Sequence, residues 1–427
     1  MNFSHLNMPD PASLTVRPAK DSDLSQIVNL DRLAFAPLQS NEAIQQQWYS
    51  NTVNLPGRKL FLAVEDETAQ GIGVYTQLDF TAFFEGQEVP IMGIGGVAVA
   101  PHRRGQRVAR LMLEHALKAA REQQIPLMAL YPFQHGFYRR LGWAWVEPVH
   151  QYRVSTQQLP LYQERSRIFP SNLDQQTPAL KEIYSQAASQ HNGWLKRQDW
   201  QWQSWLKPVA GREIYTYQES GQLLGYVVLQ FAVLDPPKNV QAVIIREWVA
   251  LTPSAYRGIL GFLASLRDQI STIVWTTFPA DPFPHLLTEQ RRDPTLSHSP
   301  FEFGLVRRFG ETGGGLMWRL ADVTTALQRR PIGFHPAFAI TFQIRDPIFG
   351  QQILGFEFRD GQIHLVEDHP YPILKLSIEH LTQLFCGVRR SRDLLWTGEL
   401  EVEGNDSLLA QLDYAWQAEP PFCWDFF

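Results

Sequence analysis

An arginine-rich turn is the segment of this sequence whose residue types and spacing are best suited to chemistry. Residues 95–109 read GGVAVAPHRRGQRVA, an apolar run followed by Arg103, Arg104 and Arg107 and then by a helical pattern. The first N–H groups of such a helix have no backbone acceptors, and the helix dipole favours an anion there. With the guanidinium groups beside it, the turn is suited to a pyrophosphate. A plain strand–turn–helix connection with solvated arginines is the alternative, which the spacing alone does not exclude.

The aromatic tail is the second feature with chemical potential. Residues 422–427 read FCWDFF, so four of the last six residues are aromatic. Exposing that much apolar surface would be costly, which argues against the frayed end that domains commonly have. The tail is therefore expected to pack against the protein and to anchor the terminal carboxylate.

The elements that must position the arginine turn form an alternating α/β pattern. A helix is expected before Phe35, with Asp21 as its N-cap, and Glu85-Gly86 indicates a hairpin. The helix after the turn is predicted because apolar residues from Val108 to Ala119 share one helical face, and it must stop before Pro126. The strands are predicted at residues 14–17, 60–65, 71–76, 91–100 and 127–131. This order is typical of an α/β unit, with 91–100 central in the sheet.

Two further segments complete the predicted organisation. Residues 151–312 repeat the strand–helix–strand order without an arginine turn, which indicates a weak internal repeat. In this part a loop is expected at 170–178, and a helix is expected to hold Trp194, Trp200, Trp202 and Trp205. Residues 313–427 are predicted to be an α+β domain in which Asp322 caps a helix at 323–329. The predicted domains are therefore 1–150, 151–312 and 313–427.

Composition excludes several classes of function. The 427 residues carry a formal net charge of −5, without the basic stripe expected of a nucleic-acid-binding protein. Cys386 and Cys423 have no zinc-like spacing, and HExxH is absent, so no metal site is expected. GxSxG, the motif of a serine nucleophile, is absent as well. No signal peptide is predicted, and the apolar run at 91–100 is half of the ~20 residues that a membrane span needs. A cytoplasmic protein that binds neither membrane nor nucleic acid is the expectation.

Residues 97–109 resemble motif A of the GNAT acetyltransferase superfamily, V-x-V-x-P-x-x-R-x-x-G-x-[GA]. Val97, Val99, Pro101, Arg104 and Ala109 match, whereas Arg107 stands where glycine is usual. Glycine there allows close backbone approach, and Gly105 supplies part of that freedom. The resemblance implies acetyl-CoA as co-substrate, with the pantetheine arm along one strand and the pyrophosphate on the following loop. The implied acetyl-CoA-binding residues are Val97, Ala98, Val99, Arg104, Gly105, Gln106, Arg107, Val108 and Ala109.

Residues 125–143, IPLMALYPFQHGFYRRLGW, resemble the Eis-like (enhanced intracellular survival) branch of that superfamily. Tyr138 stands at the position of the tyrosine taken there as the general acid for the departing CoA thiolate. A phenol has a reference pKa of about 10, above the value of about 8.5 for a thiol. A half-buried structural tyrosine is the alternative for Tyr138. Residues 247–258, 281–291 and 318–327 resemble later parts of the same family, so the resemblance spans nearly the full length.

The resemblance implies an α/β (α+β) fold. It consists of two tandem GNAT-like mixed-sheet domains, the second degenerate, followed by a sterol-carrier-protein-like α+β domain. The implied activity is acetyl transfer from acetyl-CoA to an amine of a polycationic acceptor, namely an aminoglycoside-like compound, a polyamine or a lysine. The carboxylate of Phe427 is implied as the general base, and a homohexamer is implied as the assembly.

Carboxylates are expected to line the pocket of a polycationic acceptor, and Asp31, Glu65, Glu85 and Asp425 are the candidates. Phe426 stands where part of the family has a carboxylate, so the acceptor preference can differ. Two other functions stay open. One is a non-catalytic acyl-CoA sensor or a carrier of a hydrophobic ligand, and the other is an acyltransferase for longer chains. A binding protein would need neither Tyr138 nor a carboxylate at the chain end.

Overall fold

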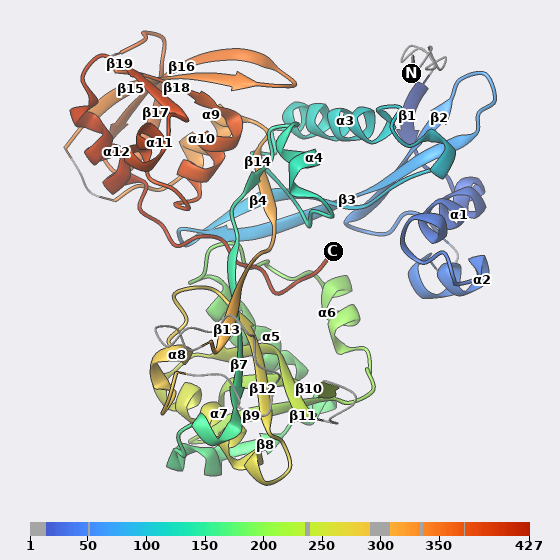
Figure 1. Cartoon of the computed structure of the whole chain (residues 1–427), viewed down its shortest axis with the longest axis vertical. Helices are drawn as coiled ribbons and strands as arrows, with labels where there is room; N and C mark the ends of the chain where they lie inside the picture. Colours follow the sequence, from blue (N-terminus) through green and yellow to red (C-terminus); the bar gives the residue numbers. More distant parts are fainter. Residues whose placement is uncertain (1–13, 50–51, 235–239, 291–307, 334–335, 371) are drawn as a thin grey trace.

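The computed structural model describes residues 14–49, 52–234, 240–290, 308–333, 336–370 and 372–427. Within these ranges the strands form three sheets, two of seven strands and one of five. Figure 1 shows that the sheets belong to three successive bodies, coloured blue to teal, green to yellow, and orange to red. Among the described residues, no helix combines the length and the apolar character needed to cross a membrane.

The first sheet has the order β1-β2-β3-β4-β5-β14-β6, and β4 and β5 are its parallel neighbours. Its strands are β1 (Leu14–Pro18), β2 (Arg58–Glu65), β3 (Gly71–Phe84), β4 (Gln87–Val99), β5 (Leu127–Leu130), β6 (Ala144–Trp145) and β14 (Met317–Leu320). The helices are α1 (Leu24–Phe35), α2 (Asn41–Ile44), α3 (Val108–Glu122) and α4 (His135–Arg139). The predicted face of α3 is confirmed, because Val108, Met112 and Ala116 are buried in the core.

The predicted N-cap Asp21 is wrong. Its carboxylate accepts hydrogen bonds from Val53 N at 3.0 Å and Thr52 Oγ1 at 3.1 Å, so it tethers a distant loop instead. The short 3₁₀ turn before α1 is closed by Asp23, whose carboxylate accepts from Lys20 N at 2.8 Å. Both aspartates are suitable as caps by residue type. Asp21 is not the cap because its carboxylate bonds the loop at residues 52–53.

The second sheet has the order β13-β7-β12-β11-β10-β9-β8. Its strands are β7 (Pro148–Ser155), β8 (Ile168–Pro170), β9 (Arg212–Glu219), β10 (Gln222–Leu234), β11 (Val240–Ala250), β12 (Thr272–Thr277) and β13 (Gly310–Gly314). The helices are α5 (Leu173–Ala188), α6 (Asp199–Leu206), α7 (Pro253–Ser265) and α8 (Phe283–Leu286). The parallel pair β11 and β12, joined through α7, repeats the arrangement of β4, α3 and β5.

Two local predictions in this part are wrong. The expected loop at 170–178 overlaps α5, which begins at Leu173 and contains Pro178. A proline near a helix start removes only one backbone hydrogen bond, which the buried face of α5 can offset. Trp194 lies before α6 rather than in it, and its ring stacks on Tyr184 instead.

The third body is built on the sheet β17-β16-β15-β18-β19. Its strands are β15 (Phe338–Asp346), β16 (Gly350–Arg359), β17 (Gln362–Val366), β18 (Ile373–Ser377) and β19 (Leu400–Glu403). The helices are α9 (Val323–Arg329), α10 (Ile378–Phe385), α11 (Ser391–Trp396) and α12 (Leu409–Ala415). The predicted cap of α9 is confirmed, because Asp322 accepts a hydrogen bond from Thr325 N at 3.1 Å.

The segment after β13 ties the three bodies together. In residues 310–320 the chain adds β13 to the second sheet beside β7 and then β14 to the first sheet beside β5. On β14, the buried Arg319 donates to Asp346 of the third body at 2.8 Å, and a single apolar cluster spans the two bodies. The domain limits at 150 and 312 stay a prediction.

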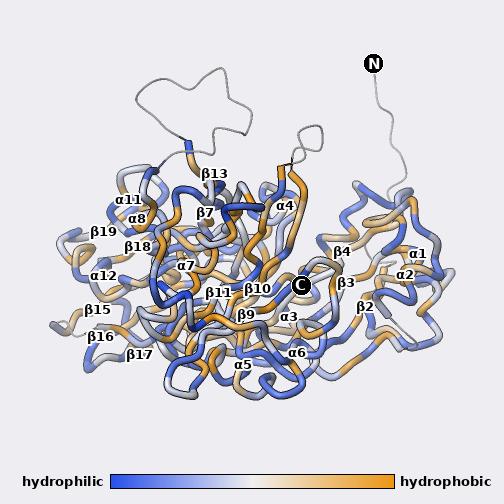
Figure 2. The backbone as a smooth tube through the Cα atoms, turned by 90° about the horizontal axis from the view of Figure 1, so that it is seen from below, coloured by the Kyte–Doolittle hydropathy of each residue, from blue (hydrophilic) through white to orange (hydrophobic). Residues whose placement is uncertain are grey.

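The tail leaves the third body and runs back between the other two. Phe422 N donates to Asn192 O at 2.9 Å, and the ring of Trp424 stacks on Trp275 at 4.9 Å. The expected packing is thus confirmed for Phe422 and Trp424, whereas Phe426 is 83% exposed. Figures 1 and 2 both place the chain end near β3 and β4 of the first sheet.

Candidate active site

The free edge of β4 is the structural feature on which the site is built. Residues 91–94 pair with residues 127–130 of β5, but β4 continues to Val99 whereas β5 ends at Leu130. Within the described chain, residues 95–99 therefore have a strand partner only on the β3 side, where Gly96 at φ +55° bends the strand. The backbone groups of Val97, Ala98 and Val99 lie along this opening. An extended ligand with amide groups could pair with them as an added strand would.

The turn after β4 presents unpaired N–H groups, as the sequence predicted. Among the described residues, the N–H groups of Gly105, Arg107, Val108 and Ala109 have no hydrogen-bond acceptor. Gly105 has φ +80°, and Arg107 adopts the left-handed conformation with φ +65° directly before α3. The backbone therefore takes the path that a glycine would allow, although an arginine stands there.

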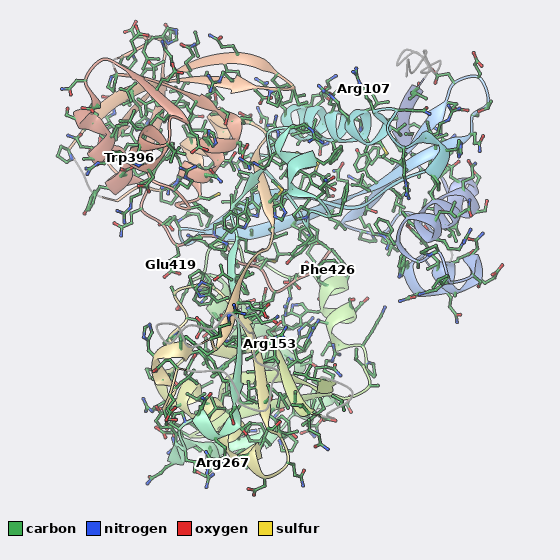
Figure 3. The ribbon with its side chains drawn as sticks, viewed as in Figure 1. Arg107, Arg153, Arg267, Trp396, Glu419 and Phe426 are labelled. Atoms are coloured by element: carbon green, nitrogen blue, oxygen red, sulfur yellow. The ribbon has the colours of Figure 1, made fainter. Side chains whose placement is uncertain are left out.

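The arginines of this turn differ in their surroundings. Arg103 is engaged by Glu65 and by Gln106 Oε1 at 3.3 Å, whereas Arg104 makes one long contact with the described residues, from its Nε to Val99 O at 3.4 Å. Arg107 forms no ion pair with the described residues, and Figure 3 shows it at the N-terminal end of α3. The turn thus combines bare N–H groups with guanidinium groups that remain available to an anion.

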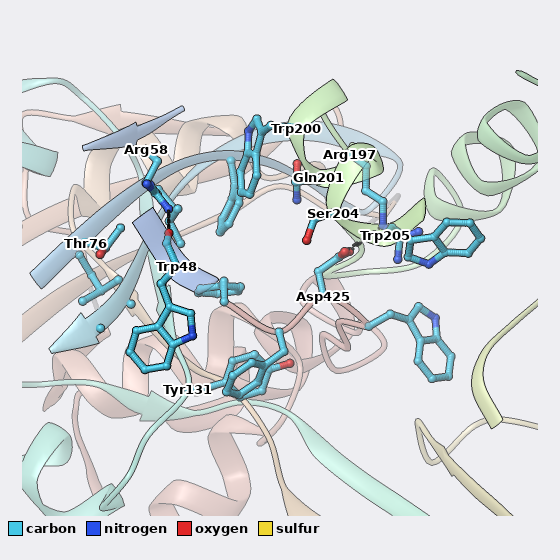
Figure 4. A pocket seen from close by; sticks show the side chains of 18 of the residues that line it. Trp48, Arg58, Thr76, Tyr131, Arg197, Trp200, Gln201, Ser204, Trp205 and Asp425 are labelled. Atoms are coloured by element: carbon cyan, nitrogen blue, oxygen red, sulfur yellow. Dashed lines mark hydrogen bonds and ion pairs between the residues drawn. The ribbon is translucent and has the colours of Figure 1, made fainter. Parts of the chain in front are cut away.

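A cavity of about 880 Å³ adjoins β4 where its free edge begins, at Gly95, Gly96 and Val97. It lies between β3 and β4, the segment that follows β5, α6 and the tail (Figure 4). Val97, Tyr138 and Phe427, three of the residues predicted from the sequence, all line it. The remaining predicted acetyl-CoA residues lie elsewhere along the edge and the turn, so the predicted set forms one continuous path.

The carboxyl group of Phe427 lies against β4. A Cβ atom on Gly95 would be 3.4 Å from the carboxyl carbon, which places this group where the free edge begins. The ring of Phe427 packs edge-on against Phe80 at 4.8 Å and Tyr131 at 5.5 Å between ring centroids. The aromatic contacts therefore fix the terminal carboxylate at the junction of β4 and the cavity.

Tyr138 is on the short helix α4, and its side chain is buried among aromatic rings. Phe133, Phe137 and Trp143 surround it edge-on, with centroids at 5.5, 5.0 and 6.4 Å. Burial raises the pKa of Tyr138 above its ordinary value. The phenol therefore keeps its proton throughout the neutral range. Its hydroxyl makes no hydrogen bond to a described residue, so it is available to a ligand in the cavity.

The tail is locked by a buried ionic cluster that sequence reasoning missed. Arg197 donates from Nε to Asp425 at 2.9 and 3.1 Å and from its two terminal nitrogens to Glu247 at 3.2 and 2.5 Å. The guanidinium also lies 3.9 Å from the ring centroid of Tyr184. Burial raises the pKa of Asp425, and the charge of Arg197 opposes this rise. One signal was present, because Glu247 is a charged residue within the apolar run of β11.

The four carboxylates predicted for an acceptor pocket separate into two groups. Asp31 and Asp425 line the cavity, although Asp425 is occupied by Arg197. Glu65 and Glu85 do not line it. Glu65 pairs with Arg103 on the outer turn, and Glu85 accepts from Asn192 Nδ2 at 2.7 Å at the β3–β4 hairpin. Glu65 and Glu85 are thus bound by Arg103 and Asn192 and do not contribute to the cavity.

Asp31 differs from the other carboxylates in its environment. It lies on the buried side of α1 and accepts a hydrogen bond from the hydroxyl of Tyr49. Burial raises the pKa of Asp31 to about 7, and the bond from Tyr49 opposes this shift. Asp31 is therefore a side chain of the cavity wall whose charge changes near neutral pH. Within the described residues, no cluster of three or more His, Cys, Asp or Glu side chains could hold a metal ion.

Family models match the chain in the order of its three bodies. A model described as acetyltransferase (GNAT) domain matches residues 15–146, and another model with that description matches residues 193–307. A model described as sterol carrier protein domain matches residues 323–424. The fold class predicted from the sequence, two GNAT domains followed by a sterol-carrier-protein-like domain, is confirmed.

Individual proteins resemble the whole chain. The N-acetyltransferase Eis of Mycobacterium tuberculosis is 23% identical over 365 residues, which cover 82% of this chain and 84% of that protein. A GCN5-related N-acetyltransferase from Anabaena variabilis superposes with a TM-score of 0.81 at 21% identity, covering 97% of this chain and 100% of that chain. For Eis1 from Mycobacterium abscessus the TM-score is 0.74 at 17% identity, again over 97% and 100%.

Proposed function

Because the chain belongs to the Eis-like branch of the GNAT N-acetyltransferases, we propose that it transfers the acetyl group of acetyl-CoA directly to an amine bound in the 880 Å³ cavity. The observation that carries this proposal is the meeting of three groups in one cavity. These are the free edge of β4, the phenol of Tyr138 and the carboxyl group of Phe427.

Acetyl-CoA would occupy the free edge of β4 and the turn that follows it. The pantetheine amides would pair with the backbone of Val97, Ala98 and Val99. The pyrophosphate would take the N–H groups of Gly105, Arg107, Val108 and Ala109 and the charges of Arg104 and Arg107. This orientation directs the thioester into the cavity where Tyr138 and Phe427 lie.

The chemistry would then proceed by direct attack. The amine nitrogen forms a bond to the thioester carbonyl carbon while backbone N–H groups of β4 stabilise the developing oxyanion. The carboxylate of Phe427 takes up the proton that the amine loses. The C–S bond breaks, and Tyr138 donates its proton to the departing thiolate. No covalent enzyme intermediate is needed.

The acceptor is proposed to be a polycationic amine, namely an aminoglycoside-like compound, a polyamine or a lysine. Among the described residues that line the cavity, Asp31, Glu247, Asp425 and Phe427 carry carboxyl groups, and aromatic side chains supply surfaces for cation–π contacts. Arg197 pairs with both Glu247 and Asp425, and its single positive charge balances one of these two carboxylates, so charge alone discriminates weakly among the three classes.

Thiol release from acetyl-CoA tests the proposal. Purified protein is mixed with kanamycin, spermine or L-lysine, and free CoA is measured together with the mass of the acetylated product. A variant extended by three residues beyond Phe427 should fold and bind CoA but release no thiol. CoA binding without thiol release by the original chain would favour the non-catalytic alternative. Full turnover by the extended variant would remove the terminal carboxylate from the mechanism.

A further inference from the structure

Arg58 is a guanidinium group on the cavity wall that has more donors than partners. It begins β2, and one terminal nitrogen donates to Trp48 O at 3.2 Å. Its Nε and its other terminal nitrogen are enclosed and have no acceptor among the described residues. It also forms no ion pair there, and burial lowers its pKa. A partly buried cation without a counter-ion and with unpaired donors is costly, so a ligand is the simplest explanation.

An unpaired acceptor lies on the same wall. One oxygen of Asp31 is bonded by Tyr49, whereas its Oδ1 is enclosed and unpaired within the described chain. The guanidinium carbon of Arg58 is 5.7 Å from the ring centroid of Tyr49. Asp31 and Arg58 therefore flank a single tyrosine, one with a spare acceptor and the other with two spare donors.

The other charges of the cavity also argue against a purely cationic ligand. Arg58, Arg212 and Arg246 all line it, and none of them forms an ion pair with a described residue. The carboxylates of Glu247 and Asp425 are both engaged by Arg197. A ligand that carries only ammonium groups would meet unpaired arginines, whereas a ligand that also carries an acidic group would neutralise them.

We propose that Arg58, Asp31 and Tyr49 form a subsite for the α-amino-acid end of the acceptor. To bind the carboxylate in a bidentate manner, Arg58 turns its two enclosed donors towards the cavity, and Asp31, held by Tyr49, turns its enclosed oxygen towards the neighbouring ammonium group. This inference rests on the proposed function and narrows its acceptor to an amine that also carries a carboxylate, the dibasic amino acids being the simplest class.

The arrangement of the cavity agrees with such an acceptor. Figure 4 shows Arg58 and Trp48 across the cavity from Arg197 and Asp425, with Tyr131 between the two sides. The carboxyl group of Phe427 lies beside Gly95 of β4 and lines the same cavity as Arg58. A flexible side chain that ends in an amine can therefore leave the subsite and reach the thioester.

The matched acceptors L-lysine and cadaverine test the subsite, because cadaverine is the same diamine without the carboxylate. The original chain should use lysine with a kcat/KM at least tenfold higher than that for cadaverine. In Arg58→Gln the value for lysine should fall about tenfold through KM, while that for cadaverine stays within about twofold. Lys59→Gln is the control, because Lys59 is the exposed neighbour that pairs with Asp79 outside the cavity.

Equal use of the two amines by the original chain, or an equal loss for both in Arg58→Gln, would overturn the subsite.

Calorimetric titration of L-lysine measures binding to the subsite without turnover. Binding should weaken about tenfold in Arg58→Gln and in Asp31→Asn, with Arg58→Lys intermediate because it keeps the charge but not the fork. If no amine releases thiol but lysine binds through Arg58, the transferase proposal fails and the subsite stands. If thiol is released but substitution of Arg58 leaves lysine binding unchanged, the transferase proposal stands and the subsite fails.

Discussion

Tyr138 and Asp31 are two buried ionisable side chains whose surroundings decide what they can do. Both side chains are buried, and burial disfavours the charged form of an acid. For the phenol this preserves a proton that a leaving group can take. For the carboxyl group it moves ionisation towards neutral pH, where a bound cation or the solvent pH can shift the balance.

Tyr138→Phe should lower kcat by roughly 10²-fold, since a positioned acid contributes on the order of 10²–10⁴ to the rate. The dissociation constant of CoA should stay within about twofold, because Tyr138 does not lie on the turn of residues 104–109. Tyr75→Phe is the matched control, since Tyr75 is a buried tyrosine that bonds His115 outside the cavity. A Tyr138→Phe variant with unchanged kcat would make the phenol a structural residue.

The raised pKa of Asp31 predicts a dependence of stability on pH. A carboxyl group whose folded pKa exceeds its unfolded value of about 3.9 stabilises the fold while it is protonated. That contribution is complete below about pH 4 and is lost as pH rises through about 7, the folded pKa. Urea unfolding at pH 5 and pH 8 should therefore show a smaller loss of free energy in Asp31→Asn. Glu147, buried with a pKa of about 7, titrates in the same window, so part of the slope should remain.

At the scale of elements, the junction of β4 and α3 depends on one unusual residue. Arg107 adopts φ +65° immediately before α3, a conformation that costs a residue with a Cβ about 1–2 kcal/mol. The sequence positions an arginine there, beside N–H groups that suit a pyrophosphate. The residue that carries the backbone strain thus also supplies a positive charge where the diphosphate is expected.

Arg107→Gly and Arg107→Ala separate the strain from the charge. Both variants lose the guanidinium, so CoA binding should weaken a few-fold in each. Only glycine removes the strain, so Arg107→Gly should be more stable than Arg107→Ala by about 1 kcal/mol in urea unfolding. Equal stability of the two variants would mean that the turn relaxes when the arginine is removed.

The elements also show where prediction from the sequence ends. The long apolar β4 and the periodic α3 could be predicted because their patterns span ten or more residues. The opening beside Val97 could not, since it arises from the shorter length of β5, which only the pairing register reveals. Asp322 was correctly predicted as a cap and Asp21 was not, because a distant loop competes for the carboxylate of Asp21.

At the scale of the whole molecule, the second body positions the chain end against the first. Arg197 precedes α6, Glu247 lies on β11, and Asp425 is two residues before the terminal carboxylate. The sequence indicated the order of the domains but not this cluster, whose members are 50 and 228 residues apart from Arg197. The second domain, which lacks an arginine turn of its own, therefore contributes to the site by holding the tail.

Asp425→Asn tests this role of the second domain. The substitution keeps the shape of the side chain but removes the charge that binds Arg197, so unfolding should become easier by about 1–3 kcal/mol. Because Phe427 is only two residues further on, its carboxylate should lose its fixed position beside Gly95, and kcat should fall about tenfold with CoA affinity unchanged. Glu419→Gln is the control, since this exposed tail residue forms no ion pair with the described chain. A stability loss with unchanged kcat would show that the aromatic contacts of Phe427 with Phe80 and Tyr131 are enough to position the chain end.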